Sequence, residues 1–543
     1  MVSSTELGVL ENLPHNWILF ATGGLLLLIL SYRHFVSTDV PKIRNLPEIP
    51  GALPIVGHLL SLGPDHATTC ERWWRKYNFA TFQVRLGNTR AVIINSFDDA
   101  YRMLVKHQSA TIDRPMLYTF HHLISSTQGF TIGTSPWSDS CKKRRTTIGK
   151  LLSRPSMKAY NPMFDLESYC IVRDLAQNSK ETTTVLYPRP YFQRYALNTS
   201  LTLCYGVRMD TMADALLNEI QDVGTEIELL RSASENLQDY IPLLRWFPSS
   251  AKKERAKELR TRRDGYLDQL INRTRDMVEK GIDNSCVAAA TYKDEEATLS
   301  DIELKSMCLS LVSGGFSTLA GTLTSCIGSL STSEGQVWQD RAYEDIMRHY
   351  SSMEDAWKGG SQDDRVPCVN AIIHEATRYY TISAMNLPRK TVTDIDWNGA
   401  IIPAGTMILA NLQAANHDVD HFGPTAAQFD PSRYLASLSP PIELPRTSGG
   451  PLHFSFGAGS RACSGQIIAH RMMYAALVRL ITSFKIVASK EAPPNTDYIE
   501  YNSSKSSLVA IPHPFQVKLV RRDEAGLERC LKEAMERTRD VYT

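Results

Sequence analysis

The segment from residue 454 to residue 465, FSFGAGSRACSG, constrains the fold of this chain more than any other stretch. Five of its positions form the pattern F-x-x-G-x-R-x-C-x-G: Phe456, Gly459, Arg461, Cys463 and Gly465. Glycines at this spacing permit a tight turn and a close approach of the backbone to a flat ligand. A long apolar run from residue 467 predicts a helix just behind the turn. The segment therefore predicts a turn that presents one cysteine at a helix N-terminus.

Cys463 is a candidate metal ligand, because the free N–H groups and the dipole of a helix N-terminus stabilise a thiolate. None of the ten cysteines belongs to a C-x-x-C pair, which argues against a structural zinc site or a redox disulfide. We expect the other nine to be small buried hydrophobes. A glycine-rich turn with a buried cysteine is the simpler alternative, but five fixed positions favour the ligand.

The bulk composition is that of a globular protein. Of the 543 residues, 43% are hydrophobic and 22% are charged, which is enough to form a sizeable core. The formal net charge is only +1, so no overall field favours nucleic acid. We expect a monomer that binds a small molecule and no nucleic acid.

The N-terminal region predicts a membrane anchor. Residues 13–32 are mostly apolar and carry no formal charge, and twenty helical residues span about 30 Å, the thickness of a bilayer core. Basic residues follow this stretch and acidic ones precede it, so the positive-inside rule places residues 1–12 in the lumen. Residues 33–57 form a basic, proline-rich hinge, and residues 58–543 form the catalytic domain on the cytosolic side.

The body reads as mainly α with small peripheral β-sheets. Residues 80–95 predict a hairpin that turns at Gly87-Asn88, and residues 137–329 are mainly helical in pattern. Residues 387–409 and 507–520 are strand-like. A long helix is predicted from Ser300 to about Ser329, where Ser300 and Glu303 form a capping box.

The cysteine segment resembles the haem-binding signature of the cytochrome P450 family, and further patterns of that family occur upstream in the expected order. The resemblance implies the cytochrome P450 fold with an N-terminal transmembrane helix. It also implies haem b, whose iron takes the Cys463 thiolate as axial ligand, and electrons from NADPH through a flavoprotein, NADPH–cytochrome P450 reductase. The enzyme would be a single-pass protein of the endoplasmic reticulum membrane with its catalytic domain in the cytosol.

The same resemblance assigns roles around the haem. Phe456 would shield the ligand, Gly459 would make the turn, and Arg461 and Arg389 (in LPRK) would reach a propionate. Trp137 resembles a helix residue that approaches the other propionate.

The basic residue expected four positions after Trp137 is replaced by Cys141, and Lys142 or Arg145 is the substitute. The basic run 142–145 is a docking face for an acidic reductase or a solvated helix face. Glu375 and Arg378 (HEATR) with Arg433 (FDPSRY) would form a buried structural network.

The long helix resembles the oxygen-activating helix of the family, with Gly314-Gly315-Phe316-Ser317-Thr318 on the pattern [AG]-G-x-[DE]-T. Two glycines cost a helix roughly 1 kcal/mol each, and a groove for dioxygen explains them. Thr318 and Ser317 are the candidate catalytic residues, but Ser317 stands where the family has an acid. A shift of one position restores no carboxylate either. Proton delivery through water or from the substrate stays open.

Five stretches resemble the fungal phenylacetate hydroxylase branch of the family: residues 82–88, 113–115, 125–137, 140–145 and 311–318. This implies a monooxygenase that hydroxylates a small aromatic or amino-acid-derived substrate, in fungal secondary metabolism or aromatic catabolism. The alternative is a haem-thiolate oxidase that dehydrogenates or couples rings, for example on an indole or a cyclic dipeptide, without oxygen insertion. By analogy the pocket walls are residues 118–132, Phe316, Thr318, 382–386 and 507–509, with no obvious charge clamp.

Overall fold

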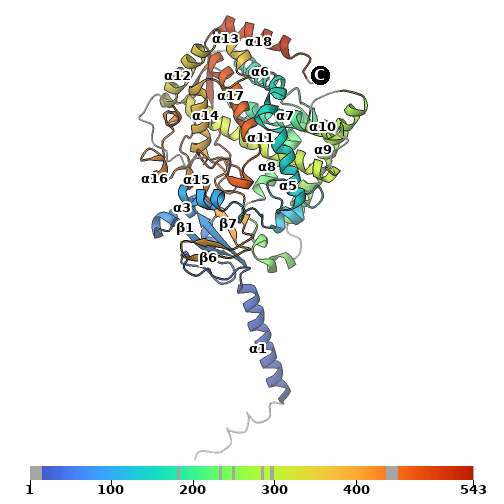
Figure 1. Ribbon diagram of the computed structural model, residues 1–543, viewed down its shortest axis with the longest axis vertical. Coiled ribbons are helices and arrows are strands. Elements are labelled where there is room, and N and C mark those ends of the chain that lie inside the picture. The colour runs from blue at the N-terminus through green and yellow to red at the C-terminus, as the bar shows by residue number, and fades with distance from the viewer. Residues whose placement is uncertain are drawn as a thin grey trace, which may run out of the picture.

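Helices make up most of the body, and the long helix α11 (Asp301–Ser331) runs through its middle (Figure 1). The computed structural model describes residues 15–179, 184–231, 235–247, 251–282, 286–293, 299–435 and 451–541. The longer helices around α11 are α3 (His66–Tyr77), α5 (Asp139–Leu151), α6 (Asn161–Asn178), α7 (Arg189–Tyr205), α8 (Ala215–Leu229), α9 (Ala251–Glu279), α12 (Ser333–His349), α14 (Pro367–Tyr380), α17 (Gln466–Ser483) and α18 (Glu524–Thr538). The shorter ones are α2 (Leu59–Leu62), α4 (Phe97–Tyr101), α10 (Val287–Lys293), α13 (Met353–Gly359), α15 (Leu412–Asn416) and α16 (Val419–Phe422).

Helix α11 begins where the capping box predicts. The Glu303 backbone N–H donates to the Ser300 hydroxyl (3.3 Å), and the Ser300 N–H donates back to the Glu303 carboxylate (2.9 Å). Among the described residues α11 is the one helix long and apolar enough to cross a membrane, with a mean hydropathy of 1.3. Its apolar window is 67% buried inside the body, so α11 is a core helix.

Three small sheets lie outside the helical core. The largest has the order β1 (Thr81–Leu86), β2 (Thr89–Ile94), β7 (Met407–Ala410), β4 (Arg389–Lys390). The second has the order β3 (Val185–Leu186), β9 (Val517–Arg521), β8 (Phe484–Ala488), and the third pairs β5 (Ile395–Trp397) with β6 (Ala400–Ile402). The predicted hairpin is confirmed as β1 and β2, with Gly87 at φ 58° in its turn. The predicted strand 507–520 is too long, because strand pairing there begins only at Val517.

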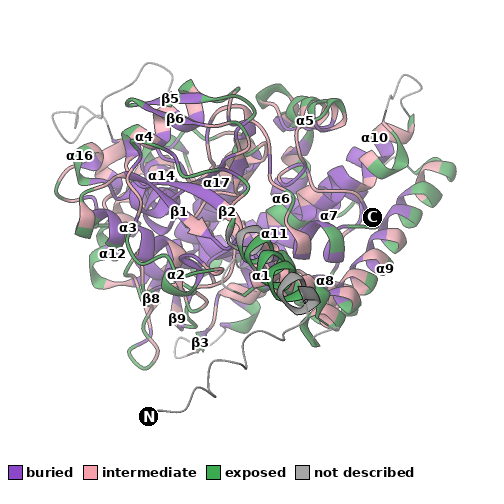
Figure 2. Cartoon of the chain, turned by 90° about the horizontal axis from the view of Figure 1, so that it is seen from below, coloured by how far each residue is buried: buried purple, intermediate pink, exposed green. Residues whose placement is uncertain are grey.

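Helix α1 (His15–Val36) projects from the end of the body that carries β1 and β6 (Figure 1). In Figure 2, the residues of α1 that are not grey have the colour of exposed residues. Large apolar side chains along it are exposed: Phe20, Leu25, Leu26, Leu27, Ile29 and Leu30. The helix extends four residues beyond the predicted anchor 13–32, and the predicted lumenal residues 1–12 lie outside the described part of the chain.

The predicted hinge, residues 33–57, is not a free linker over its whole length. The Gln83 side-chain amide on β1 donates to the carbonyls of Ile43 (2.8 Å) and Leu46 (2.7 Å). Ile43 and Leu46 are themselves buried in the core beside the first sheet. Because burial and hydrogen bonds hold these residues, the second part of the segment belongs to the catalytic body.

Candidate active site

The cysteine loop lies between β7 and α17 and includes the helical turn η7 (Gly459–Arg461). Gly457 and Gly459 have φ of 65° and 62°, and a Cβ on Gly459 would lie 2.1 Å from the Leu104 carbonyl oxygen. Only glycine fits there without a shift of the backbone. The Cys463 N–H donates to the Phe456 carbonyl (2.8 Å), which closes the loop just before α17. The predicted turn and the helix behind it are thus present, with α17 starting at Gln466.

Cys463 differs from the other nine cysteines, which are all buried, because its side chain is exposed. The protein atoms that enclose the sulfur raise the pKa of the thiol by desolvation, and the Gly465 N–H and the Arg145 cation oppose this rise. The N-terminus of α17 lies three residues further on and also favours a negative charge. Cys463 is therefore accessible to a ligand, and the Gly465 N–H and the Arg145 cation offset part of the desolvation that disfavours its thiolate.

Three arginines from separate segments, Arg114, Arg145 and Arg389, gather around Arg461 of this loop. Arg389 on β4 donates to the Ala458 carbonyl (2.6 Å), and Arg145 on α5 donates to the Ala462 carbonyl (2.9 Å). Arg461 donates to the Ser135 carbonyl (2.8 Å). Arg114 donates to the carbonyls of Leu387 and Pro388, immediately before Arg389. Burial lowers the pKa of all four, and Arg389 falls to about 9, with repulsion from Arg461 and Arg145 as further causes.

The arginines lack an anionic partner within the described chain. None of the four forms an ion pair with a described carboxylate, and three of their nitrogens are buried without a hydrogen-bond partner: Arg114 Nε, Arg389 Nη1 and Arg461 Nε. Buried unpaired charge is costly, so this cluster is suited to a ligand that brings carboxylates. A haem with its two propionates fits beside an accessible cysteine. Arg114 was missed by sequence reasoning, although it lies in the 113–115 stretch that carries the family resemblance.

Trp137 lies beside this cluster but not on a helix, which corrects the prediction. Trp137 stands two residues before α5, whose N-cap is Ser138. Its backbone N–H donates to Asp113 Oδ1 (2.6 Å). The Arg461 guanidinium lies 5.8 Å from the Trp137 ring centre. Trp137 and Arg461 therefore approach the same site from two segments.

The side chains of the basic run 142–145 do not form one exposed face. Arg144 is buried and donates to the Phe130 carbonyl (2.8 Å), and Lys143 lies 3.4 Å from Glu303. Arg145 points to the cysteine loop, which leaves Lys142 as the exposed member. Lys142 and Arg145 were the candidates for the basic residue in whose place Cys141 stands. Arg145 reaches the cysteine loop, and Lys142 does not. The Cys141 sulfur lies 3.5 Å from an Arg461 nitrogen.

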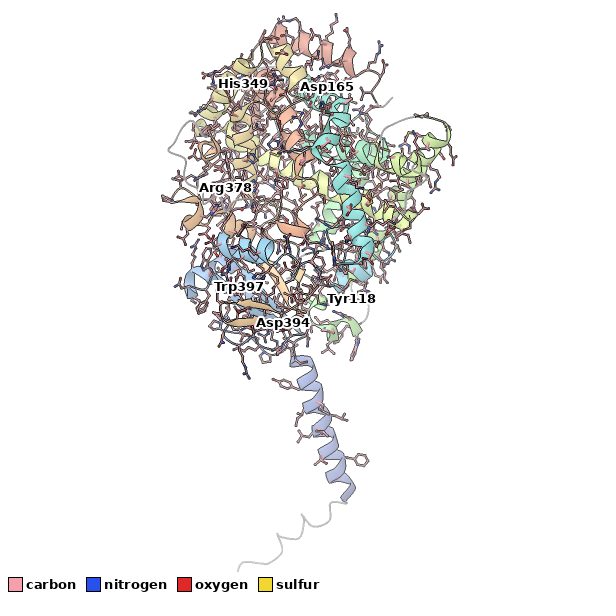
Figure 3. The ribbon with its side chains drawn as sticks, viewed as in Figure 1. Tyr118, Asp165, His349, Arg378, Asp394 and Trp397 are labelled. Carbon is pink, nitrogen blue, oxygen red and sulfur yellow. The ribbon has the colours of Figure 1, made fainter. Side chains whose placement is uncertain are left out.

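The structure brings Glu375, Arg378 and Arg433 together. Arg378 makes two 2.7 Å hydrogen bonds to the Glu375 carboxylate, and the nearest Arg433–Glu375 distance is 3.4 Å. The three side chains are almost completely buried. Further carbonyls, including those of Asn416 and Ala426, accept from Arg378. Figure 3 shows Arg378 inside the body, further from α1 than Trp397 and Asp394. The network ties α14 to the chain before the cysteine loop, as a structural role requires.

The two glycines of α11 have different surroundings. A Cβ on Gly315 would lie 2.4 Å from the Ser200 hydroxyl of α7, so this glycine allows close helix packing. Gly314 has open space beside it and is exposed within a largely buried helix. The Thr318 hydroxyl donates to the Gly314 carbonyl (2.7 Å). An open position followed by a hydroxyl one turn later fits the predicted groove at Gly314 and Thr318.

Ser317 has a partner that the sequence did not indicate. Its hydroxyl donates to Oε1 of Glu228, at the end of α8, and both residues are buried. Burial raises the pKa of Glu228 to about 7. The Ser317 hydrogen bond and the Arg231 and Arg189 cations act in the opposite direction and lower the pKa. Glu228 stands in no recognisable motif, and 89 residues separate the two partners, so no local signal pointed to it.

A cavity runs from the arginine cluster past the predicted substrate walls. Three of the predicted wall regions contribute lining residues: Phe120 and His121, Ile382 and Ala384 to Asn386, and Ser507 and Leu508. Phe316 is not a wall residue. It is buried, and its ring packs so closely on Gly224 of α8 that an added Cβ there would lie 2.8 Å from the ring. Thr318 is likewise not among the residues that line this cavity.

Arg231 corrects the expectation that the pocket has no charge clamp. It lines the cavity, and its guanidinium lies 4.2 Å from the Phe120 ring centre. Burial lowers its pKa to about 10, and Glu228 opposes that shift. No carboxylate oxygen of the described residues lies within 4 Å of the Arg231 guanidinium. The cavity wall therefore offers a cation beside an aromatic face.

Comparisons with known proteins agree with this geometry. The family model for cytochrome P450 matches residues 47–519. The chain is 44% identical to phenylacetate 2-hydroxylase of Emericella nidulans, over 94% of this chain and 96% of that protein. It is 35% identical to 3-hydroxyphenylacetate 6-hydroxylase of the same organism, over 90% and 92%. A cytochrome P450 monooxygenase of Mycosarcoma maydis is 34% identical, over 90% and 89%.

Proposed function

This chain belongs to the cytochrome P450 family, and from that premise we propose that it hydroxylates a small aromatic acid of the arylacetate type. It is a monooxygenase related to phenylacetate and hydroxyphenylacetate hydroxylases. The observation that carries the substrate proposal is Arg231, a cation in the cavity wall beside the Phe120 ring. A ligand with a carboxylate and an aromatic ring would satisfy both groups at once.

Proteins of this family use haem with a cysteine thiolate as iron ligand, and a reductase supplies the electrons. Bound haem supplies the activation of dioxygen, which thiolate ligation favours. Cys463 would be the ligand, held at the end of a loop that Gly457 and Gly459 shape. The propionates would take the place of the missing partners of Arg114, Arg145, Arg389 and Arg461. Phe456, through its carbonyl, fixes the Cys463 backbone.

The residues that line the cavity, together with Thr318, would bind and orient the substrate. Arg231 would hold the carboxylate at one end, and the ring would pack on the apolar wall that Ile382 and Leu508 help to form. Thr318, at the open position of α11, would hold a proton on its Oγ1. A fixed carboxylate sets which ring carbon reaches the reacting centre, because orientation by a remote group positions the rest of a small molecule.

Membrane attachment through α1 belongs to the same proposal. Helix α1 has 22 residues, and the large apolar side chains that the structure describes from Phe20 to Leu30 are exposed. Trp246 and Phe247 are 79% and 62% exposed, at the end of η5 (Pro242–Trp246). Both segments are bonded to Asn88 in the turn of the β1–β2 hairpin. Just before η5, the Tyr240 carbonyl accepts from the Asn88 N–H, and just after α1, the Asp39 N–H donates to the Asn88 carbonyl. Both apolar features therefore lie at one end.

The basic residues after α1, with the acidic ones before it, favour a cytosolic body on the endoplasmic reticulum, where an NADPH–cytochrome P450 reductase would be the electron donor. Hydroxylation of an aromatic acid suits catabolism as well as secondary metabolism. The alternative without oxygen insertion was motivated by the missing acid beside Thr318. A carboxyl group, that of Glu228, accepts a hydrogen bond from Ser317, which stands in the place of the acid, and this weakens the motive for the alternative.

The test is turnover of phenylacetate by the holoenzyme with reductase and NADPH under isotopically heavy dioxygen. The expected product is a hydroxyphenylacetate that carries one heavy oxygen atom, as seen by mass spectrometry. A dehydrogenated or coupled product without the label would replace hydroxylation by the alternative. Substrate-induced spectral shifts across arylacetates, indoles and cyclic dipeptides would then identify the ligand class.

A further inference from the structure

The helix that carries Thr318 has no acid of its own at the neighbouring position, where Ser317 stands. The Ser317 hydroxyl instead donates to Oε1 of Glu228 on α8. We propose that Glu228 supplies, from the neighbouring helix, the carboxylic acid that α11 lacks, and that it acts through Ser317. Glu228 is then a positioning residue: it holds a proton at Ser317 and does not touch the reacting atoms.

The packing of α8 on α11 fixes this contact. On α8, Gly224 lies against the Phe316 ring, and a Cβ on Gly224 would come within 2.8 Å of that ring. Glu228 is four residues further along α8 and therefore lies on the same face, one turn on. On the other side of α11, Gly315 lies against Ser200 of α7. Close contacts on both sides hold α11 in one register, so residue 317 meets residue 228 rather than solvent.

The surroundings of Glu228 suit a group that exchanges protons near neutrality. Its carboxyl is buried among α8 and α11, and burial raises its pKa to about 7. The charged groups that face it are Arg231, on the next turn, and Arg189, at the start of α7, and both favour its ionised form. General acids work best when their pKa lies near the operating pH. Glu228 meets that condition, whereas an exposed glutamate does not.

The proton step balances without an oxidant or reductant. The Ser317 hydroxyl donates to the ionised carboxylate of Glu228. When Glu228 is protonated, this hydrogen bond reverses: the Glu228 O–H donates to Ser317 Oγ, and the Ser317 hydroxyl turns to a water that would bridge to Thr318 Oγ1. Glu228 then gives its proton to Ser317 Oγ, and Ser317 gives its own hydroxyl proton to that water. Glu228 is left as a carboxylate, and a proton from solvent restores it. No electron moves and no bond other than O–H bonds breaks or forms. This relay uses the hydroxyl of Ser317 as a link, which a carboxylate at position 317 would not need.

The main test compares Glu228→Gln with Glu226→Gln in the holoenzyme. Glutamine keeps the size and the hydrogen-bonding oxygen of Glu228 but holds no titratable proton. Glu226 lies on the same helix, and its carboxylate pairs with Arg255 at the surface. Infrared difference spectra need no substrate: a carboxylic acid C=O band should titrate near pH 7 in the wild type and in Glu226→Gln, and be missing in Glu228→Gln.

A second readout is the fraction of NADPH electrons that reach product rather than hydrogen peroxide, with any accepted substrate. We expect it to fall in the wild type as the pH rises through about 7, because Glu228 loses its proton. Product formation by Glu228→Gln should be about a hundredfold lower and independent of pH in this range. Ser317→Asp in the Glu228→Gln background should restore most of it, since the acid then lies on α11.

Wild-type product yield and an unchanged pH profile in Glu228→Gln would overturn the proposal, as would a band that persists in that variant. The reduced carbon monoxide spectrum shows whether each variant folds and holds haem. If Glu228→Gln does not fold, Ser317→Ala breaks the same hydrogen bond with the loss of one oxygen atom. If the pKa of Glu228, read from its infrared band, is the same in Ser317→Ala as in the wild type, the proposal is overturned. A changed pKa of Glu228, together with a smaller fraction of NADPH electrons that reach product, would support it.

Discussion

Four arginines around the cysteine loop repel one another, and the lowered pKa of Arg389, about 9, records that repulsion together with burial. A folded chain keeps such groups together only when something else compensates for the cost. At the residue scale this makes unpaired nitrogens, rather than formed hydrogen bonds, the clearest mark of a ligand site. Arg231 is a further cation with a pKa lowered by burial, and it lies in the cavity wall.

Arg231→Gln should weaken the binding of phenylacetate about ten- to a hundredfold, because a hydrogen bond to a charged group contributes about 1.5–3 kcal/mol. Substrate-induced spectral titration measures the Kd. Phenylacetamide, which has no charge, should bind the variant and the wild type about equally. Arg262→Gln, which removes a surface cation paired with Glu219, is the matched control. Equal losses for acid and amide would exclude Arg231 as the carboxylate clamp.

Glu228→Gln should change how stability depends on pH. The folded-state pKa of Glu228, about 7, lies above its ordinary value of 4.5, so its favourable contribution is complete below about 4.5 and is lost as the pH rises through about 7. The shift corresponds to roughly 3 kcal/mol. Denaturant unfolding of the holoenzyme at pH 5 and pH 8 should therefore show a smaller loss of stability in Glu228→Gln than in the wild type. Identical losses would contradict the raised pKa.

At the scale of elements, glycines set the distances between the parts of the site. Gly459 lets the cysteine loop approach the Leu104 carbonyl, Gly315 lets α11 approach α7, and Gly224 receives the Phe316 ring. These contacts join segments that are far apart in the chain. The position of Cys463 and of Ser317 therefore depends on backbone approach, and not only on the side chains themselves.

Gly459→Ala should prevent haem incorporation, since its Cβ would meet the Leu104 carbonyl at 2.1 Å and its φ is positive. We expect a loss of roughly 3 kcal/mol or more, and the haem content per protein measures the effect. Gly399→Ala is the control: its φ is 81°, but no atom lies within 4 Å of the added Cβ. Its cost should stay near 1 kcal/mol. Full haem content in Gly459→Ala would contradict the close packing of the loop.

The sequence predicted correctly those elements that residues close together in the chain determine. The capping box of α11, the Gly87–Asn88 hairpin and the glycine turn before Cys463 all form as their residues indicate. The strand expected over 507–520 and the helical place of Trp137 were wrong, since nothing local fixes where strand pairing or a helix begins there.

The site could be predicted only where a motif carried it. The sequence pointed to Cys463, Arg389 and Arg461, which the structure brings together at the cysteine loop, but it gave no sign of the positions of Arg114 and Glu228. Their roles arise from partners far away in the chain, as the 89 residues between Glu228 and Ser317 illustrate. Tertiary packing makes such pairs, and no spacing in a single sequence encodes them.

At the scale of the whole molecule, one end of the body carries the features that suit a membrane. Helix α1 leaves the body there (Figure 1). The chain just before the exposed Trp246 and Phe247 is bonded to the same hairpin, through the Asn88 N–H and the Tyr240 carbonyl. The cavity lining includes Leu62, Leu86 and Tyr240, which belong to this end too.

Removal of residues 1–36 should leave the haem spectrum intact while weakening the binding to lipid vesicles, which flotation measures. In the shortened protein, Trp246→Ser with Phe247→Ser should weaken the remaining binding roughly tenfold or more, because two exposed aromatic side chains lose their burial in lipid. The control pair is Val337→Ser with Val419→Ser, exposed apolar residues on α12 and α16. Equal effects of both pairs would show that the end near α1 is not the membrane-facing one.

The central claim is that iron is bound by the sulfur of Cys463, and the reduced carbon monoxide difference spectrum tests it most directly. Cys463→Ser should lose the absorption band typical of thiolate-ligated haem, while Cys530→Ser, which alters a buried cysteine on α18, should keep it. Serine preserves the size of the side chain, so loss of the band would report the ligand and not the packing. A thiolate band that survives in Cys463→Ser would contradict the account.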